Sequence, residues 1–232
     1  MTARHVLWTP PPAPRRGPKP KFTLDGVTDA AIAIADAEGL DAVTMQRVAE
    51  RLGTTKMALY RYVSGRADLD AVMLDRALGE PPTLAADDWR AGLRAWAATI
   101  FTRMTARPWT VELAQRPHVP GPLELRWYER GLAAMSQLPL TGGERLDVLA
   151  LITGHIMAVV RLEAGAASPE ADLTSGLGPI LGERAEEYPL TAAAFAEAAT
   201  LGERDQALGF GLERVLDGIA SLAVSRAASA DG

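Results

Sequence analysis

The chain has 232 residues, of which 48% are hydrophobic, 23% are charged and none is cysteine, and its net charge is −5. This length and apolar content are typical of a soluble chain with a sizeable core, and the lack of cysteine excludes disulfides, thiolate nucleophiles and cysteine-ligated metals. The N-terminus has no apolar signal region, and the longest apolar stretch, 149–160, is shorter than a membrane span. A cytoplasmic location without membrane contact is therefore predicted.

Charge is divided unevenly along the chain. Residues 1–66 carry ten lysines and arginines against six acidic residues, whereas residues 67–232 carry fourteen against twenty-three. Such segregation indicates a small anion-binding module joined to a larger acidic body, although a solvated surface without any partner gives the same imbalance.

The first 22 residues contain six of the sixteen prolines and no periodic apolar pattern. They are predicted to form a disordered, proline-rich arm with a basic end at Arg15, Arg16, Lys19 and Lys21. From Thr23 the apolar spacing is helical, and no run alternates as a strand does, so an all-α fold is predicted. The expected parts are a three-helix module at 23–66, a linking helix at 67–82 and a larger helical body at 83–232.

The module at 23–66 is predicted to contain one longer helix that ends at Gly39 and two short helices, 44–52 and 55–63. Thr44 is placed to cap the second helix, and Thr54 or Thr55 the third. This order is typical of a helix-turn-helix, which lays its last helix in the DNA major groove. An ordinary three-helix subdomain with a polar face fits the same periodicity.

The last short helix carries chemistry suited to DNA. If Leu59 and Val63 pack inward, the outward side chains supply hydroxyl, ammonium, phenol and guanidinium groups that can donate to phosphates and reach base edges. These outward residues are Thr55, Lys56, Tyr60 and Arg61.

The body is predicted to be helical with one loose region. Helices are expected at about 66–79, 89–106, 122–135, 144–164 and 203–228, with short helices near 109–115 and 191–200. Residues 165–190 are rich in glycine, proline and glutamate and are expected to form a loose loop holding one short helix. Their glycine pattern at 176–182 has the wrong spacing for a dinucleotide loop and is also expected to be loop.

Residues 23–70 resemble the N-terminal domain of TetR-family transcriptional regulators. The carrying pieces are Glu38-Gly39-Leu40, Val43-Thr44, Val48-Ala49, Leu52-Gly53, Ala58-Leu59-Tyr60, Tyr62-Val63 and Leu69. The resemblance implies that Thr44 and Tyr60 contact phosphates and that Arg66 helps to anchor the backbone. Gln46, Lys56 and Met57 are then expected to face bases. The family commonly has phenylalanine or histidine at the place of Tyr62 and lysine at the place of Arg66, and the base-facing set is this chain's own. The whole candidate DNA-binding set is Thr44, Gln46, Thr54, Thr55, Lys56, Met57, Tyr60, Arg61, Tyr62 and Arg66.

Residues 87–225 resemble, more loosely, the ligand-binding domain of the tetracycline-repressor branch. The resemblance implies a pocket for a small-molecule inducer and a homodimer that pairs through the last long helices. Full burial within one chain explains the same apolar helices, and aromatic or methionine stripes also occur as plain core. The candidate ligand-binding residues are Trp96, Phe101, Met104, Trp109, Trp127, Tyr128, Met135 and His155.

These observations predict a ligand-responsive, homodimeric repressor. It is expected to bind double-stranded operator DNA and to leave it when a small apolar or amphipathic molecule binds. The alternative is a ligand-sensing or protein-interaction protein without sequence-specific DNA binding. No nucleophile elbow, phosphate loop or metal-binding spacing occurs in the sequence, so no enzyme activity, cofactor or metal is expected.

Overall fold

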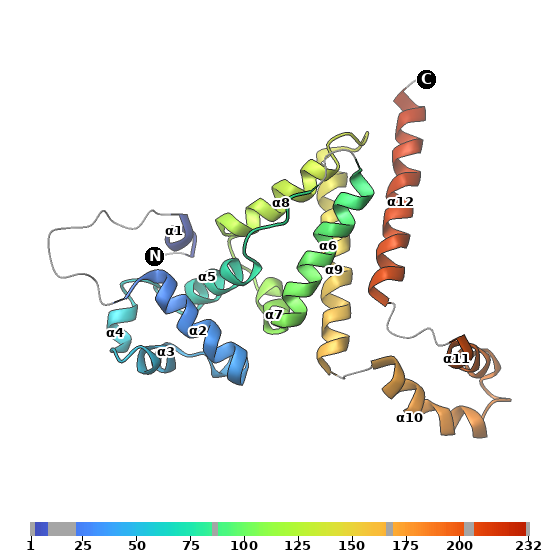
Figure 1. Cartoon of the computed structure of the whole chain (residues 1–232), viewed down its shortest axis with the longest axis horizontal. Helices are drawn as coiled ribbons and strands as arrows, with labels where there is room; N and C mark the ends of the chain where they lie inside the picture. The colour runs from blue at the N-terminus through green and yellow to red at the C-terminus, as the bar shows by residue number, and fades with distance from the viewer. Residues whose placement is uncertain (1–2, 9–21, 85–87, 166–168, 202–206, 231–232) are drawn as a thin grey trace. The chain divides into compact units, whose positions relative to one another are not determined.

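The computed structural model describes residues 3–8, 22–84, 88–165, 169–201 and 207–230. These residues form helices and contain no strand, which confirms the all-α prediction (Figure 1). The elements are α1 (Ala3–Trp8), α2 (Leu24–Glu38), the 3-10 helix η1 (Leu40–Ala42), α3 (Met45–Arg51), α4 (Lys56–Leu59), α5 (Arg66–Leu78), α6 (Trp89–Ala106), α7 (Trp109–Gln115), α8 (Pro122–Ala134), α9 (Gly142–Gly165), α10 (Pro169–Glu183), α11 (Pro189–Leu201) and α12 (Ala207–Ala230).

The chain forms two compact units, Met1–Gln137 and Leu138–Gly232. The boundary at 82/83 that the sequence indicates between linking helix and body stays a prediction. The structure groups α6, α7 and α8 with the N-terminal module because α5 packs against α7 and α8 as well as against α2. Helix α5 thus packs against α1, α2, α6, α7 and α8 within the first unit.

The three-helix module forms as the sequence pattern predicts, except that its last helix, predicted at 55–63, ends at Leu59 and is followed by a turn at 60–62. The Thr44 hydroxyl accepts a hydrogen bond from the Arg47 backbone N–H at 3.1 Å and caps α3, and the Thr55 hydroxyl accepts from the Ala58 N–H at 3.3 Å and caps α4. Each cap satisfies a backbone donor that the first turn of a helix leaves without an intrahelical partner. Leu59 is completely buried. The predicted inward face of this segment is therefore confirmed.

Helix α5 carries a buried carboxylate that caps another helix. The Asp75 Oδ1 atom accepts hydrogen bonds from the backbone N–H groups of Leu123 and Glu124, both at 2.9 Å, in the first turn of α8. The residue that precedes α8, Gly121, supplies no side-chain cap, so Asp75 takes that role from across the unit. Burial raises the pKa of the Asp75 carboxyl, while the two amide bonds oppose this shift.

Gly121 lets the Asp75 carboxylate approach. A Cβ atom at this position would lie 2.3 Å from the carboxyl carbon and from Oδ1 of Asp75, far inside van der Waals contact. Any larger residue would therefore displace the cap of α8.

His118 lies in the loop before α8 and is also held by polar contacts. Its Nδ1 atom is 2.8 Å from the Arg116 carbonyl oxygen, and its Nε2 atom is 3.0 Å from Oε2 of Glu124. The hydrogen bond to Glu124 raises the pKa of the imidazole from its ordinary 6.5 to about 8, against the opposing effect of burial.

The His118 contacts make the first unit more stable in mild acid. Because the folded pKa lies above the ordinary value, the stabilisation is full below pH 6.5 and is lost as the pH rises through about 8. We expect the free energy of unfolding to fall by at most about 2 kcal/mol across this window. Urea denaturation of the wild type and of His118→Gln on both sides of the window measures it. Equal pH dependence in the two proteins would contradict the assignment.

The N-terminal arm differs from the prediction of disorder. Ala3–Trp8 form the short helix α1, which packs on α5 and buries Val6. The proline-rich composition of 1–22 indicates disorder, but the segment also contains the apolar run Val6-Leu7-Trp8, which makes this contact. Arg15, Arg16, Lys19 and Lys21, the predicted basic end of the arm, lie outside the described residues.

In the second unit the two long helices α9 and α12 pack against each other. The apolar residues predicted to line α9 are buried: Val148, Leu149, Ile152, Ile156, Val159 and Val160. In α12, Leu212, Leu216, Ile219 and Ala223 are buried, while Leu222 is more than one-third exposed. The predicted core face of each long helix is thus largely confirmed.

The loose loop predicted for 165–190 is mostly helical. Helix α10 covers fifteen residues, includes Pro179, and packs against α9 and α11. The glycine pattern at 176–182 therefore lies in a helix and not in a loop. Leu173, Leu177 and Leu181 are spaced four residues apart, and this helical period outweighed the poor helix propensity of glycine and proline.

The prediction that no apolar segment is long enough for a membrane span is wrong for helix α9. Its 24 residues have a best window of mean hydropathy 1.5, so by length and composition it could cross a bilayer. The core helix of a soluble protein passes the same test. Here the packing of α9 against α12 uses its apolar face within the unit.

Candidate nucleic-acid interface and ligand residues

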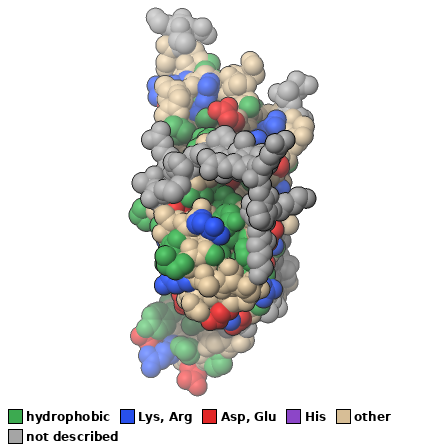
Figure 2. All heavy atoms as spheres, turned by 90° about the vertical axis from the view of Figure 1, so that its left-hand side faces the viewer, with side chains coloured by type: hydrophobic (Ala, Val, Ile, Leu, Met, Phe, Trp, Pro, Cys, Tyr) green, Lys and Arg blue, Asp and Glu red, His purple; other side chains and the backbone are tan. Residues whose placement is uncertain are grey.

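The predicted DNA-binding side chains lie on α3 and α4, on the residues beside these helices, and at the start of α5. Lys56 and Arg61 are exposed, as are Thr44, Gln46 and Thr55, while Thr54 is half-buried. Basic, acidic and hydrophobic side chains are interspersed on the side of the molecule shown in Figure 2. Both capping threonines use a hydroxyl oxygen as acceptor, so each O–H remains available to donate. These features suit contact with phosphate oxygens.

Lys56 and Tyr60 form a pair on the outer face of α4. The Lys56 Nζ atom lies 6.0 Å from the centre of the Tyr60 ring, at the outer limit of a cation–π contact. Tyr60 is 37% exposed and Met57 is 74% exposed. A methionine this exposed at the start of a short helix offers an apolar contact of the kind that reads a thymine methyl group.

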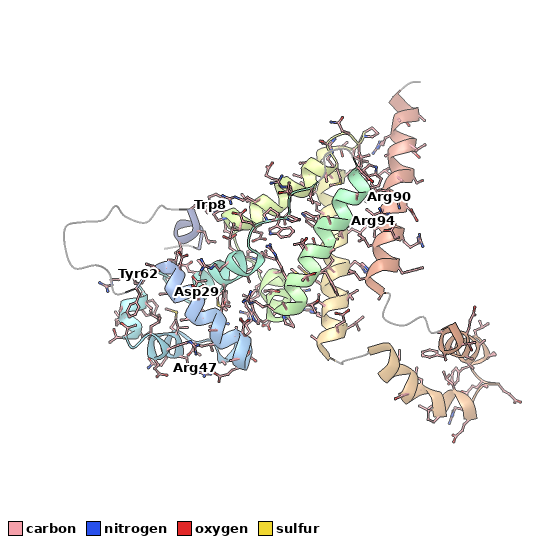
Figure 3. All side chains as sticks on the ribbon, viewed as in Figure 1. Trp8, Asp29, Arg47, Tyr62, Arg90 and Arg94 are labelled. Carbon is pink, nitrogen blue, oxygen red and sulfur yellow. The ribbon has the colours of Figure 1, made fainter. Side chains whose placement is uncertain are left out.

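Two predicted DNA contacts are engaged inside the module instead. The Tyr62 hydroxyl donates to the Phe22 carbonyl oxygen at 2.8 Å and fixes the entry of the chain into α2 (Figure 3). The Arg66 guanidinium donates to the carbonyl oxygens of Val43 and Leu40. Both residues therefore support the module, and a role in contacting DNA stays a prediction for them.

Arg66 is also part of a longer chain of ion pairs. Its Nε donates to Asp70 at 2.5 Å, and the other carboxylate oxygen of Asp70 accepts from Arg116 at 2.6 Å. The i,i+4 spacing of Arg66 and Asp70 was the sequence signal for the first pair. Nothing in the sequence pointed to Arg116, which follows α7. The pairs connect the segment before α3 to the loop before α8.

Gln46 and Arg47 are held on the outside of α3. The Gln46 side-chain amide donates to Glu50 at 2.8 Å, so a base contact by Gln46 requires that bond to be exchanged. Arg47, which the sequence reasoning missed, donates to Glu38 of α2 (Figure 3), and this bond lowers the pKa of the Glu38 carboxyl.

Five of the eight candidate ligand residues are buried in the first unit: Trp96, Met104, Trp109, Trp127 and Met135. Trp96 and Trp127 meet edge to face with ring centres 6.0 Å apart. Their indole N–H groups donate to the carbonyl oxygens of Trp127 and Gly79, both at 2.9 Å. The Arg103 guanidinium lies 5.1 Å from the centre of the Trp127 ring.

The other three ligand candidates are not fully buried. Phe101 is half-buried and Tyr128 is 40% exposed, since α8 turns Trp127 inward rather than its neighbour. The Trp109 indole donates to Asp36 of α2 at 2.8 Å, which ties it to the three-helix module. His155 belongs to the second unit, and a role in ligand binding stays a prediction for all eight candidates.

A hollow of about 320 Å³ lies between α2, α5 and the end of α6. It is lined by Asp29, Ile32, Ala33, Asp36, Arg76 and Arg107. Its charged groups pair with one another, since Arg76 contacts Asp29 at 3.0 Å and Arg107 contacts Asp36 at 3.1 Å. None of the candidate ligand residues lines this hollow.

His155 is paired within the second unit. Its Nε2 atom lies 3.1 and 3.2 Å from the carbonyl oxygens of Ala207 and Leu208 at the start of α12. The ring lies directly over Gly211, where an added Cβ atom would be 2.3 Å from Nε2. The contact explains how a polar ring is accommodated on the mostly apolar helix α9.

We expect Gly211→Ala to destabilise the second unit by about 1–3 kcal/mol, because the added methyl group displaces the His155 ring from its partners. Gly209→Ala is the matched control, since it lies on the same helix with open space around it. Alanine there is expected to be neutral or to stabilise the helix by up to about 1 kcal/mol. Thermal unfolding of both variants measures the difference. Equal melting temperatures would show that His155 does not restrict position 211.

A helix-turn-helix module whose first turns face outward, joined to a helical body, defines a DNA-binding regulator. Comparison with known families agrees. Residues 27–69 match the model of bacterial regulatory proteins of the tetR family, and residues 81–223 match the tetracycline repressor-like C-terminal domain. The chain therefore belongs to the TetR family of transcriptional regulators.

One relative extends this assignment over almost the whole chain, and solved structures show the same fold. The HTH-type transcriptional repressor DrrR1 of Streptomyces coeruleorubidus is 35% identical over 95% of this chain and 86% of its own length. The crystal structure of apo ActR from Streptomyces coelicolor matches with a TM-score of 0.78 and 24% identity over 89% of this chain and 98% of that chain. The complex of ActR with actinorhodin matches with a TM-score of 0.74, 22% identity and coverage of 86% and 96%.

Proposed function

We propose that the chain is a homodimeric repressor that binds a near-palindromic operator and releases it when a small apolar or amphipathic molecule binds. The observation that carries the proposal is the outward set on the first turns of α3 and α4, with Lys56, Met57 and Tyr60 exposed together. The name of DrrR1 as a repressor supports the direction of regulation. ActR binding actinorhodin supports the class of ligand.

Two arguments support dimerisation: the short reach of one module and the apolar surface of the second unit. A single helix-turn-helix reads too few base pairs for useful specificity, so such modules bind as dimers to half-sites about 34–36 Å apart. Large apolar side chains remain exposed on the two long helices of this unit, as a second copy would need. They are Leu146, Leu151, Leu162, Phe210, Leu222 and Val224.

The mechanism rests on differential affinity. A ligand releases DNA only if it binds better to a dimer geometry in which the two α4 helices no longer match the half-site spacing. A coupling free energy of about 1–3 kcal/mol weakens operator binding roughly 5–150-fold. The described geometry offers a route for this coupling, because α5 contacts the three-helix module, α7 and α8.

A gel-shift experiment with the DNA upstream of the protein's own gene tests the proposal. Retardation that survives excess unrelated DNA, with two protein chains per site, supports a dimeric operator-binding regulator. Sequence-blind retardation that disappears with salt supports instead the ligand-sensing or protein-interaction alternative. A compound screen then follows, in which an inducer both lowers operator affinity and raises thermal stability.

A further inference from the structure

The short helix α1 occupies a defined site on the first unit. It packs along α5 and leaves Val6 only 9% exposed. The Trp8 indole N–H donates to the Pro120 carbonyl oxygen at 3.1 Å, across 112 residues of sequence (Figure 3). Helix α1 therefore touches two separate parts of the unit, which are the linking helix and the loop before α8.

These two parts are the same ones that the Asp75 cap joins. Pro120 directly precedes Gly121, over which the Asp75 carboxylate lies, and Asp75 belongs to α5. The Asp75 bonds connect α5 to the first turn of α8 from one position. Helix α1 connects α5 to the adjoining backbone through an independent set of contacts.

Hydrogen bonds connect this junction to the three-helix module. The first residue of α5, Arg66, holds the carbonyl oxygens of Leu40 and Val43 just before α3. Asp70, one turn further along α5, accepts a hydrogen bond from Arg116. A shift of α5 relative to α8 therefore moves the backbone that positions α3, and anything that spans α5 and Pro120 opposes the shift.

We propose that α1 is a strap that acts within its own chain and locks the linking helix α5 to the loop before α8. The strap uses one buried aliphatic side chain and one indole hydrogen bond, Val6 and Trp8. This role goes beyond the proposed function, because it concerns how freely the junction opens whether or not DNA or a ligand is bound.

Hydrogen–deuterium exchange of the full chain, without DNA or ligand, tests the strap. The first variant lacks residues 2–8, and the second is Trp8→Phe, which keeps an aromatic ring but loses the N–H donor. Losing one buried side chain and one hydrogen bond is expected to raise the opening equilibrium of the site roughly 5–30-fold. Amide exchange in α5 and in residues 117–124 should accelerate accordingly, by less in Trp8→Phe than in the deletion. Exchange in α9 and α12 should stay unchanged.

Trp89→Phe is the matched control, because it makes the same substitution at a half-buried tryptophan of α6. It should leave exchange in 117–124 unchanged. The proposal is overturned if the deletion leaves exchange at the junction unchanged, or if exchange rises equally throughout both units, which would indicate general destabilisation. The deletion retains Arg15, Arg16, Lys19 and Lys21. If the deletion variant lost operator binding without faster exchange, that result would contradict the strap but not the proposed DNA recognition.

Discussion

Replacing Lys56 with alanine is expected to weaken specific operator binding about 5–150-fold, because a well-placed side chain that reads a base edge is worth about 1–3 kcal/mol. Lys56 is exposed at the first position of α4. Tyr60→Phe removes only a phenol O–H that is placed to reach a phosphate. It should therefore weaken binding to operator DNA and to unrelated DNA by similar factors, both smaller than the factor expected for Lys56→Ala. Fluorescence anisotropy with both DNAs at one fixed salt concentration measures the difference.

Arg130→Ala serves as the control for Lys56→Ala, because it removes one positive charge from an exposed position on α8. It should leave specific binding nearly unchanged. Sedimentation should find the same oligomer for all three variants. If Arg130→Ala and Lys56→Ala weaken operator binding equally, overall charge rather than contact by α4 governs binding.

Gly121→Ala is expected to destabilise the first unit by about 2–4 kcal/mol. The new methyl group would lie 2.3 Å from the Asp75 carboxyl, so it combines overpacking with the loss of hydrogen bonds to buried backbone N–H groups. Gly26→Ala is the control in the same unit, because its Cβ meets only the Thr23 hydroxyl at an ordinary 3.5 Å. Urea denaturation measures both.

A double-mutant cycle identifies the cause of the Gly121 effect. Asp75→Ala alone should cost about 1–3 kcal/mol, because it leaves two N–H groups of α8 without their acceptor. In that background Gly121→Ala should cost much less than in the wild type, since the group it collides with is gone. Strictly additive costs would show that the carboxylate is not what restricts Gly121.

The sequence was sufficient for those parts of the fold that depend on local interactions. The caps at Thr44 and Thr55 bond to backbone only three residues away, and such spacing is visible in the sequence. The inward turn of Leu59 and Val63 follows from their four-residue separation. For the same reason the exposure of Lys56 and Tyr60 could be predicted.

Contacts between distant residues could not be predicted in this way. The bond from Asp75 to the first turn of α8 spans 48 residues, and that from Trp109 to Asp36 spans 73. Neither separation matches the period of a helix or a strand, and no feature of the composition indicates either bond. For the same reason the resemblance that placed Tyr62 and Arg66 at DNA could not indicate that both donate to backbone carbonyl groups of the module.

Because Asp75 of α5 caps α8, the position at which this regulator is joined to parts of another protein matters. A chimera that joins residues 22–79 to a foreign sensor would bring along the Asp75 carboxylate without the Leu123 and Glu124 amides that it needs. A swap in the other direction would leave the α8 amides without an acceptor. Transplants of this protein should therefore be cut after α8, so that donor and acceptors travel together.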